Sequence, residues 1–153
     1  MHLRRIGRMA MLAAAFALAA ATGAAAQGPA RYTVFGGALL GTPSGFGAGA
    51  NLTFNLNHNV SFDPGLAVGR SGNTGLFTAS GVFRYEFHVD DEALIPYLLG
   101  GVGLSQWGST THGSAIVGVG ARIPFHHELW IVPEVRAGDH GLARFTIGIS
   151  KSF

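Results

Sequence analysis

The chain has 153 residues and a formal net charge of +2, but three of its ten Lys and Arg residues precede residue 27, and all eight Asp and Glu residues follow it. Seven basic and eight acidic residues therefore remain after residue 26, which gives no reason to expect nucleic acid or an acidic partner. The chain has no cysteine, so thiol catalysis and thiolate metal sites are excluded.

The first 26 residues follow the pattern of a secretory signal peptide. Three arginines and an alanine-rich apolar run over residues 9–21 lead to Ala24-Ala25-Ala26, which offers small residues for cleavage. The run is short for a membrane helix and no stop-transfer flank follows it. We therefore predict a cleaved signal peptide over residues 1–26, export across the inner membrane, and one domain over residues 27–153.

Eight segments of about strand length follow, separated by turn signals. Glycine supplies 22 of the residues after residue 26, which disfavours long helices. No apolar run there approaches the roughly 18 residues of a spanning helix. The segments are 31–40, 45–57, 60–69, 76–89, 95–107, 114–123, 129–137 and 143–153. An even number of strands suits closure, so the predicted fold is all-β: an eight-stranded antiparallel up-and-down transmembrane β-barrel.

Alternation of apolar and polar residues supports this division. In the last segment Ala143, Phe145, Ile147 and Ile149 share one face, and polar or small residues share the other. The segment 95–107 is different, because it has large apolar residues on both faces and its phase is not fixed. Those on one face are Leu98, Val102 and Leu104, and those on the other are Tyr97, Leu99 and Trp107. A β-bulge would explain this mixed phase.

Two eight-stranded architectures fit the alternation, and they are inside out relative to each other. A membrane barrel has an apolar belt outside, whereas a lipocalin-like periplasmic carrier has an apolar pocket inside. Only 12% of residues are charged, which is few for a soluble surface, and aromatic residues gather near the segment ends. The aromatics predicted for one rim are Phe46, Phe77, Trp107 and Phe145, and those for the periplasmic rim are Phe54, Phe62, Phe87, Tyr97, Phe125 and Phe153. Both features favour the membrane barrel.

Seven charged residues of the segments fall on the face opposite the large apolar ones. They are Asp63, Arg84, Glu86, Arg122, Glu134, Arg136 and Arg144. In a membrane barrel this face lines a narrow lumen, where carboxylates stay ionised beside arginines. We therefore predict a salt-bridged plug without a wide pore; an ion or proton path is the alternative.

Several motifs resemble those of one protein family. Pro96-Tyr97 precedes Gly100-Gly101-Val102-Gly103, and a second stretch runs from Val132 to Arg136. At the end of the chain Thr146, Gly148 and Phe153 resemble the terminal signal of bacterial outer-membrane barrels, although Lys151 occupies a position that is usually hydrophobic. Together these motifs resemble the bacterial outer-membrane β-barrel domain family, the small barrels of OmpA and OmpX type. The resemblance implies an outer-membrane location and a monomer. It also implies two partners: outer-membrane lipid, and the barrel-assembly machinery, which would bind the C-terminal strand.

Two histidine motifs invite chemical hypotheses. His112-Gly113-Ser114 resembles the His-x-Ser pair of lipid A 3-O-deacylases, since residues two apart in a strand share a face, but Ala115 and Ile116 then depart from that family's motif. His126-His127-Glu128 resembles a metal cluster, but adjacent residues in an extended turn are expected to point apart.

We therefore predict no catalytic, cofactor or metal site. The predicted function is a non-enzymatic outer-membrane barrel with a structural or minor-permeability role. The alternatives are a periplasmic lipocalin-like carrier of a small apolar ligand and a lipid A-modifying enzyme. The predicted outer connections, residues 41–45, 69–75, 108–113 and 138–142, are short, which gives no support for a receptor or adhesin.

Overall fold

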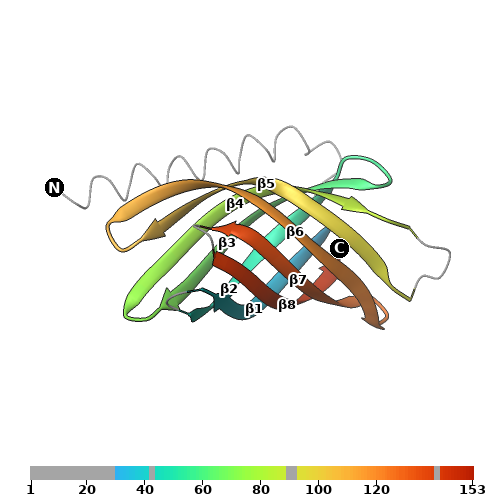
Figure 1. The fold of residues 1–153 in the computed structure, drawn as a ribbon. Helices are drawn as coiled ribbons and strands as arrows, with labels where there is room; N and C mark the ends of the chain where they lie inside the picture. Colours follow the sequence, from blue (N-terminus) through green and yellow to red (C-terminus); the bar gives the residue numbers. More distant parts are fainter. Residues whose placement is uncertain (1–29, 42–43, 89–92, 140–141) are drawn as a thin grey trace.

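A computed structural model describes residues 30–41, 44–88, 93–139 and 142–153. The predicted signal peptide and the acidic turn at residues 90–92 lie outside these ranges. The strands are β1 (Arg31–Leu40), β2 (Gly45–Asn55), β3 (Val60–Ser71), β4 (Thr74–Glu86), β5 (Ile95–Trp107), β6 (Thr110–His126), β7 (Leu129–Asp139) and β8 (Leu142–Ser152). Every strand is antiparallel to its neighbours, and β1 pairs with β8, which closes the barrel (Figure 1). The predicted eight-stranded antiparallel barrel is confirmed.

The hairpin turns at one end are tighter than predicted. Gly72-Asn73 joins β3 to β4, and Gly108-Ser109 joins β5 to β6. Gly72 and Gly108 have φ values of 58° and 59°, which glycine adopts without the steric cost of a Cβ. The glycine-rich and polar residues beside these turns continue the ladders, as the pairing of Ser71 with Thr74 shows. The loops predicted over residues 69–75 and 108–113 were therefore too long.

Strand β5 contains no bulge, so that part of the prediction is wrong. Its register is continuous with β4 and with β6. Leu98, Val102 and Leu104 lie outward and are exposed, while Tyr97 and Leu99 lie inward and are buried. Both faces are apolar because the inward residues belong to a small internal core. That core consists of Val82, Tyr97, Leu99, Ile116 and Val132.

Register shifts occur instead beside β7. One lies between Pro124 and His126 on β6, and the other between Ala137 and Asp139 on β7. At the second shift Gly138 has a φ of 128°, a backbone conformation that residues with a side chain rarely adopt. Irregularities of this kind generally bend a strand locally and increase its twist.

Burial shows which face of the sheet is inside. Asp63 and Arg84 are each only 1% exposed, whereas Ile147 and Ile149 on β8 are 54% and 59% exposed. A soluble carrier needs the reverse arrangement, with charge outside and apolar side chains within. The described residues include no helix long and apolar enough to cross a membrane. The barrel thus presents an apolar outer surface and encloses its charges.

The predicted aromatic rims are only partly right. Of the predicted rim residues, those with exposed rings are Phe46, Phe77, Phe87, Phe125, Phe145 and Phe153. Trp107 is half-buried. Phe54 and Phe62 pair across β2 and β3, and both are buried, with Phe62 packed against Phe83 at a centroid distance of 5.2 Å. Tyr97 lies inside the barrel, because its hydroxyl bonds to a lumenal carboxylate, so its assignment to the rim is wrong.

Candidate functional site in the barrel interior

All seven charged residues predicted for the lumen are buried on the inward face. They are Asp63, Glu86, Glu134, Arg84, Arg122, Arg136 and Arg144. Arg31 joins them, although it was not among the residues predicted for the lumen. Gly36 and Gly37 obscure the phase of its strand. The alternation of Arg31 and Thr33 with Tyr32 and Val34 was the signal that could have identified it.

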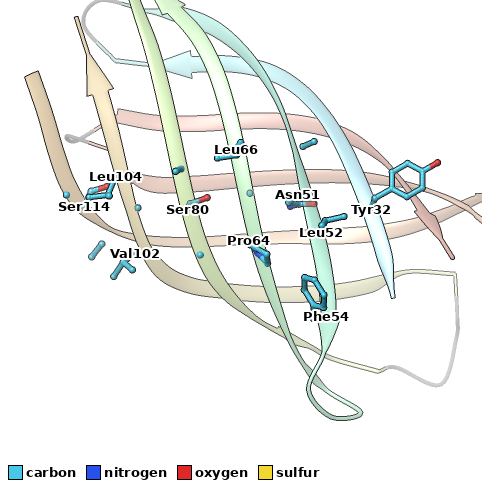
Figure 2. Close-up of a pocket in the computed structure, with 17 residues that line it drawn as sticks. Tyr32, Asn51, Leu52, Phe54, Pro64, Leu66, Ser80, Val102, Leu104 and Ser114 are labelled. Carbon is cyan, nitrogen blue, oxygen red and sulfur yellow. The ribbon is translucent and has the colours of Figure 1, made fainter. Parts of the chain in front are cut away.

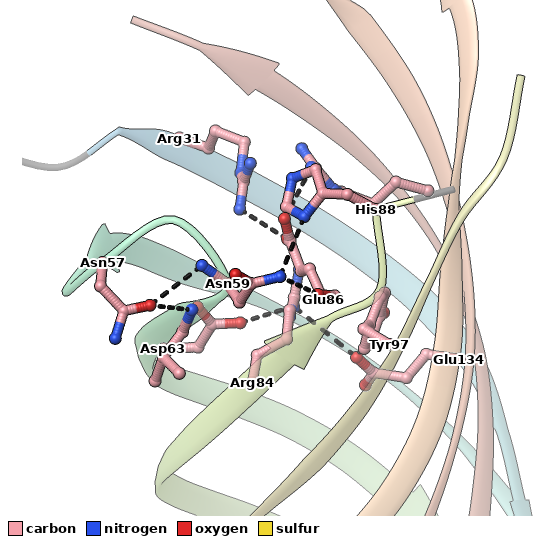
Figure 3. A network of polar contacts seen from close by, with 11 residues as sticks. Arg31, Asn57, Asn59, Asp63, Arg84, Glu86, His88, Tyr97 and Glu134 are labelled. Atoms are coloured by element: carbon pink, nitrogen blue, oxygen red, sulfur yellow. Dashed lines mark hydrogen bonds and ion pairs between the residues drawn. The ribbon is translucent and has the colours of Figure 1, made fainter. Parts of the chain in front are cut away.

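Arg31, Glu86 and Arg122 form a cluster that we call the triad. Glu86 Oε1 accepts a hydrogen bond from the Arg31 guanidinium at 2.9 Å (Figure 3). Glu86 Oε2 accepts one from Arg122 at 2.8 Å. These side chains come from β1, β4 and β6, so the triad crosses the lumen between strands that are not neighbours. The Arg122 guanidinium also lies 4.9 Å from the ring centroid of Trp130, a cation–π contact.

Asp63, Arg84, Glu134 and Arg136 form a second cluster, which we call the tetrad. The Arg84 guanidinium lies 2.5 Å from Asp63 Oδ2 and 3.8 Å from Glu134 Oε2, so it links β3 to β7 (Figure 3). Arg136 Nε donates to Glu134 Oε1. Each arginine thus has a carboxylate partner, which is the condition under which buried charges are tolerated.

Tyr97 connects the tetrad to the small apolar core. Its hydroxyl donates to Glu134 Oε2 at 2.8 Å, and its ring packs against the Arg84 guanidinium at 4.1 Å. Gly120 is the cross-strand partner of both Tyr97 and Glu134. A Cβ at Gly120 would meet the phenol ring, so glycine is the residue that allows Tyr97 to reach across β6.

Arg144 lies apart from the triad and the tetrad. Its guanidinium packs on Phe35 at 5.2 Å, and it lines a small internal space with Leu39, Leu76 and Thr78. The predicted cluster of seven charges is therefore divided. Six of them, with Arg31, lie in the triad and tetrad, towards the end of the barrel where β1 begins and β8 ends.

His112 and Ser114 lie at the opposite end of the barrel, near the start of β6. Their cross-strand partners on β5 are Ser105 and Gly103, and both residues have interaction partners. Gly120, which pairs with Glu134, is eight residues beyond His112 on β6, a distance of about 27 Å in an extended strand. The carboxylate of Glu134, which belongs to the tetrad, is therefore far from the His-x-Ser pair.

The His126-His127 pair contradicts the expectation that adjacent residues point apart. His127 has a φ of 24°, and the Nδ1 atoms of the two rings lie 2.7 Å apart. This positive φ turns the second ring back towards the first, whereas an extended backbone would separate them. Within the described ranges, no three metal-binding side chains come together.

A hollow on the outward face of the barrel wall is lined by residues of β1 to β6 (Figure 2). Its lining includes small outward residues such as Ala50, Ala79 and Ala115, between larger ones such as Leu66 and Leu104. Tyr32 is the only titratable side chain among the described residues that line it. The hollow therefore has an apolar surface and lacks the paired groups that acid–base chemistry requires.

The three residues of the predicted terminal signal differ in their surroundings. Thr146 is buried in the lumen, and Phe153 is 75% exposed and packs against Tyr32 at 5.5 Å. Gly148 is close to Thr33, because a Cβ there would lie 2.9 Å from the Thr33 methyl group. Gly148 therefore has a packing role in the closing pair of strands, whatever its role in recognition.

Structural comparisons agree with this architecture. No protein-family model and no curated protein matches the chain. Neisserial surface protein A superposes with a TM-score of 0.67 at 13% identity, covering 80% of this chain and 95% of that one. The N-terminal β-barrel domain of Pseudomonas aeruginosa OprF gives 0.66 at 14%, covering 83% and 100%. The outer membrane enzyme PagL gives 0.58 at 15%, covering 81% and 100%. The chain has the fold of the small eight-stranded outer-membrane β-barrels.

Proposed function

We propose that this protein is a structural, non-enzymatic barrel of the outer membrane. The observation that carries the proposal is the inverted burial: arginines and carboxylates fill the interior, and large apolar side chains cover the outside. Exposed belts of Leu, Val, Ile and Phe are unfavourable in water but are stable against hydrocarbon. An outer-membrane lipid environment satisfies both faces of the sheet.

The proposed permeability is small. Eight strands enclose little more than the volume of their inward side chains. The triad and tetrad cross the lumen in one part of the barrel, and the core of Val82, Tyr97, Leu99, Ile116 and Val132 lies beside them. Ion pairs and apolar packing together support a closed barrel with a minor role in permeation.

The proposed partners are outer-membrane lipid and the barrel-assembly machinery, and the proposed state is a monomer. Strand β8 supports the second partner, because it closes the barrel on β1 and is followed by the exposed Phe153. An exposed aromatic at a strand end is available to a recognition site before the barrel closes. We propose that Thr146, Gly148 and Phe153 form that terminal signal.

Fractionation of cells that express the full-length chain tests the location. The protein is expected in the outer membrane, to require detergent for extraction, and to migrate differently on a gel before and after heating. A cleaved protein that is soluble and monomeric without detergent would refute the proposal and would support a periplasmic carrier.

A catalytic role is a separate question, because the similarity to PagL shows only a shared fold. Purified wild-type protein and a His112→Ala variant are to be incubated with lipid A, and released fatty acid is to be measured. The expected result is no release by either protein. Release that is lost in the variant would show that the barrel is an enzyme.

A further inference from the structure

The triad has an unbalanced positive charge. It contains two arginines, Arg31 and Arg122, and one carboxylate, Glu86, whereas the tetrad contains two arginines and two carboxylates. All three triad residues are buried, with at most 8% of their surface exposed. Within the described part of the chain, the triad therefore carries a net charge of +1 in a region from which bulk water is largely excluded. Such a charge is costly unless a counter-charge accompanies it.

The triad also has more hydrogen-bond donors than acceptors. Both Glu86 oxygens already accept a bond from an arginine. The Nε–H groups of Arg31 and Arg122 are buried and have no protein acceptor in the described residues. The nearby tetrad offers Arg84 Nε in the same condition. Buried donors of this kind are normally satisfied, so the site is suited to an added acceptor.

We propose that the triad binds a small monovalent anion of the size of chloride. One negative charge balances the net +1, whereas a divalent anion would reverse it. Guanidinium N–H groups are strong donors to anions, and charge-assisted bonds of this kind are the stronger ones. The small lumen of an eight-stranded barrel favours an ion without bulky substituents.

The position of the triad gives the anion a route to solvent. Arg31 is the first residue of β1, and its register partner on β8 is Ser152, the last residue of that strand. Glu86 is the last residue of β4. The anion is therefore bound close to one mouth of the barrel, at the end where Phe153 belongs to the predicted periplasmic rim. This inference concerns the lumen and goes beyond the structural role proposed above.

Trp130 supplies a local probe for this site. Its ring lies beside Arg122, and the chain has only one other tryptophan, Trp107. Trp107 is the last residue of β5, at the end of the barrel opposite the triad. A Trp107→Phe background therefore leaves Trp130 as the single fluorescent reporter. Iodide quenches indole fluorescence on contact. Iodide titrations of the detergent-solubilised protein are to be made at constant ionic strength, with gluconate replacing iodide.

The expected result is a saturable quenching component in the Trp107→Phe protein that added chloride relieves. Arg31→Gln removes the net charge, so the iodide affinity is expected to fall at least about tenfold. Glu86→Gln raises the net charge to +2, so the affinity is expected to rise. Arg70→Gln is the matched control, because Arg70 is exposed at the β3–β4 turn and bonds only locally, to Gly72 and Asn73. Its titration is expected to be unchanged.

Linear iodide quenching with the same slope in the Trp107→Phe protein and in its Arg31→Gln, Glu86→Gln and Arg70→Gln variants would overturn the proposal. Heated and unheated gels are to establish that each variant is folded. If both triad variants fail to fold, crystals of the wild-type protein with bromide decide the matter. An anomalous peak within hydrogen-bond distance of Arg31 and Arg122 supports the site, and density for water alone at saturating bromide refutes it. The readouts do not depend on membrane location, so they can fail independently of the fractionation test.

Discussion

Single carboxylates connect distant strands of this barrel. Glu86 on β4 binds arginines from β1 and β6, and Glu134 on β7 binds Arg136 while accepting from Tyr97 on β5. Each carboxylate thus serves more than one donor in a place with little water. Loss of one such group leaves several donors without a partner, and that penalty exceeds the value of the pair itself.

Replacement of Glu134 by alanine is expected to destabilise the folded barrel by about 3–5 kcal/mol, the range for breaking a buried pair. Arg136 and the Tyr97 hydroxyl would both lose their acceptor. The measurement is the urea unfolding midpoint in detergent. Glu128→Ala is the control, because Glu128 is exposed and lies 3.9 Å from Lys151 in a surface pair. Equal midpoints for the two variants would show that Glu134 is well solvated.

Gly120 is a second residue whose replacement has a specific expected effect. A Cβ at position 120 would overlap the ring of Tyr97, so Gly120→Ala is expected to cost about 1–3 kcal/mol through overpacking. The control is Gly75→Ala, because nothing lies within 4 Å of a Cβ built at Gly75. Thermal unfolding monitored by heated-gel migration measures both. A Gly120→Ala protein as stable as the control would mean that the Tyr97 ring moves without cost.

At the scale of the strand, β8 combines two tasks. It completes the barrel by pairing with β1 and β7, and it leads into the exposed aromatic Phe153. Packing explains Gly148, which is tight against Thr33. Packing does not explain Phe153, whose ring contacts Tyr32 but remains 75% exposed. The two tasks can therefore be separated by mutation.

Phe153→Ala is expected to lower the amount of barrel in the outer membrane while leaving the unfolding midpoint of refolded protein within about 0.5 kcal/mol. The reason is that an exposed ring adds little to packing but remains available for recognition. Phe125→Ala is the matched control, since Phe125 is 70% exposed near the β6–β7 turn. Equal membrane levels for both variants would remove Phe153 from the proposed terminal signal.

The sequence was sufficient for strands that have one apolar and one polar face. The alternation in β8 predicted the inward Arg144 and the outward Ile147. It failed for β5, where Tyr97 and Leu99 face an internal apolar core that no periodicity can distinguish from an outer belt. Contacts across the lumen depend on closure and on χ angles, so the sharing of Glu86 between β1 and β6 was also beyond the sequence. The positive φ of His127 was missed for a similar reason, because non-glycine residues rarely adopt it.

At the scale of the whole molecule, the interior is closed by two kinds of contact. The triad and tetrad form a polar layer, and Val82, Leu99, Ile116 and Val132 add apolar side chains to it. Purified protein in planar bilayers is therefore expected to show no steady open channel. Glu86→Gln is expected to remain closed as well, because the apolar residues are unchanged. A stable conducting state in the wild-type protein would contradict this arrangement.

The brevity of the turns at one end has a consequence for the living cell. Among the described residues, the connections between β3 and β4 and between β5 and β6, Gly72-Asn73 and Gly108-Ser109, are each two residues long. The predicted outer end of the barrel thus displays two very short turns. Proteases need an extended stretch of several residues to bind their substrates, and antibodies need a comparable surface. Protease treatment of intact cells is therefore expected to leave these two turns uncut, and antibodies are expected to bind them poorly.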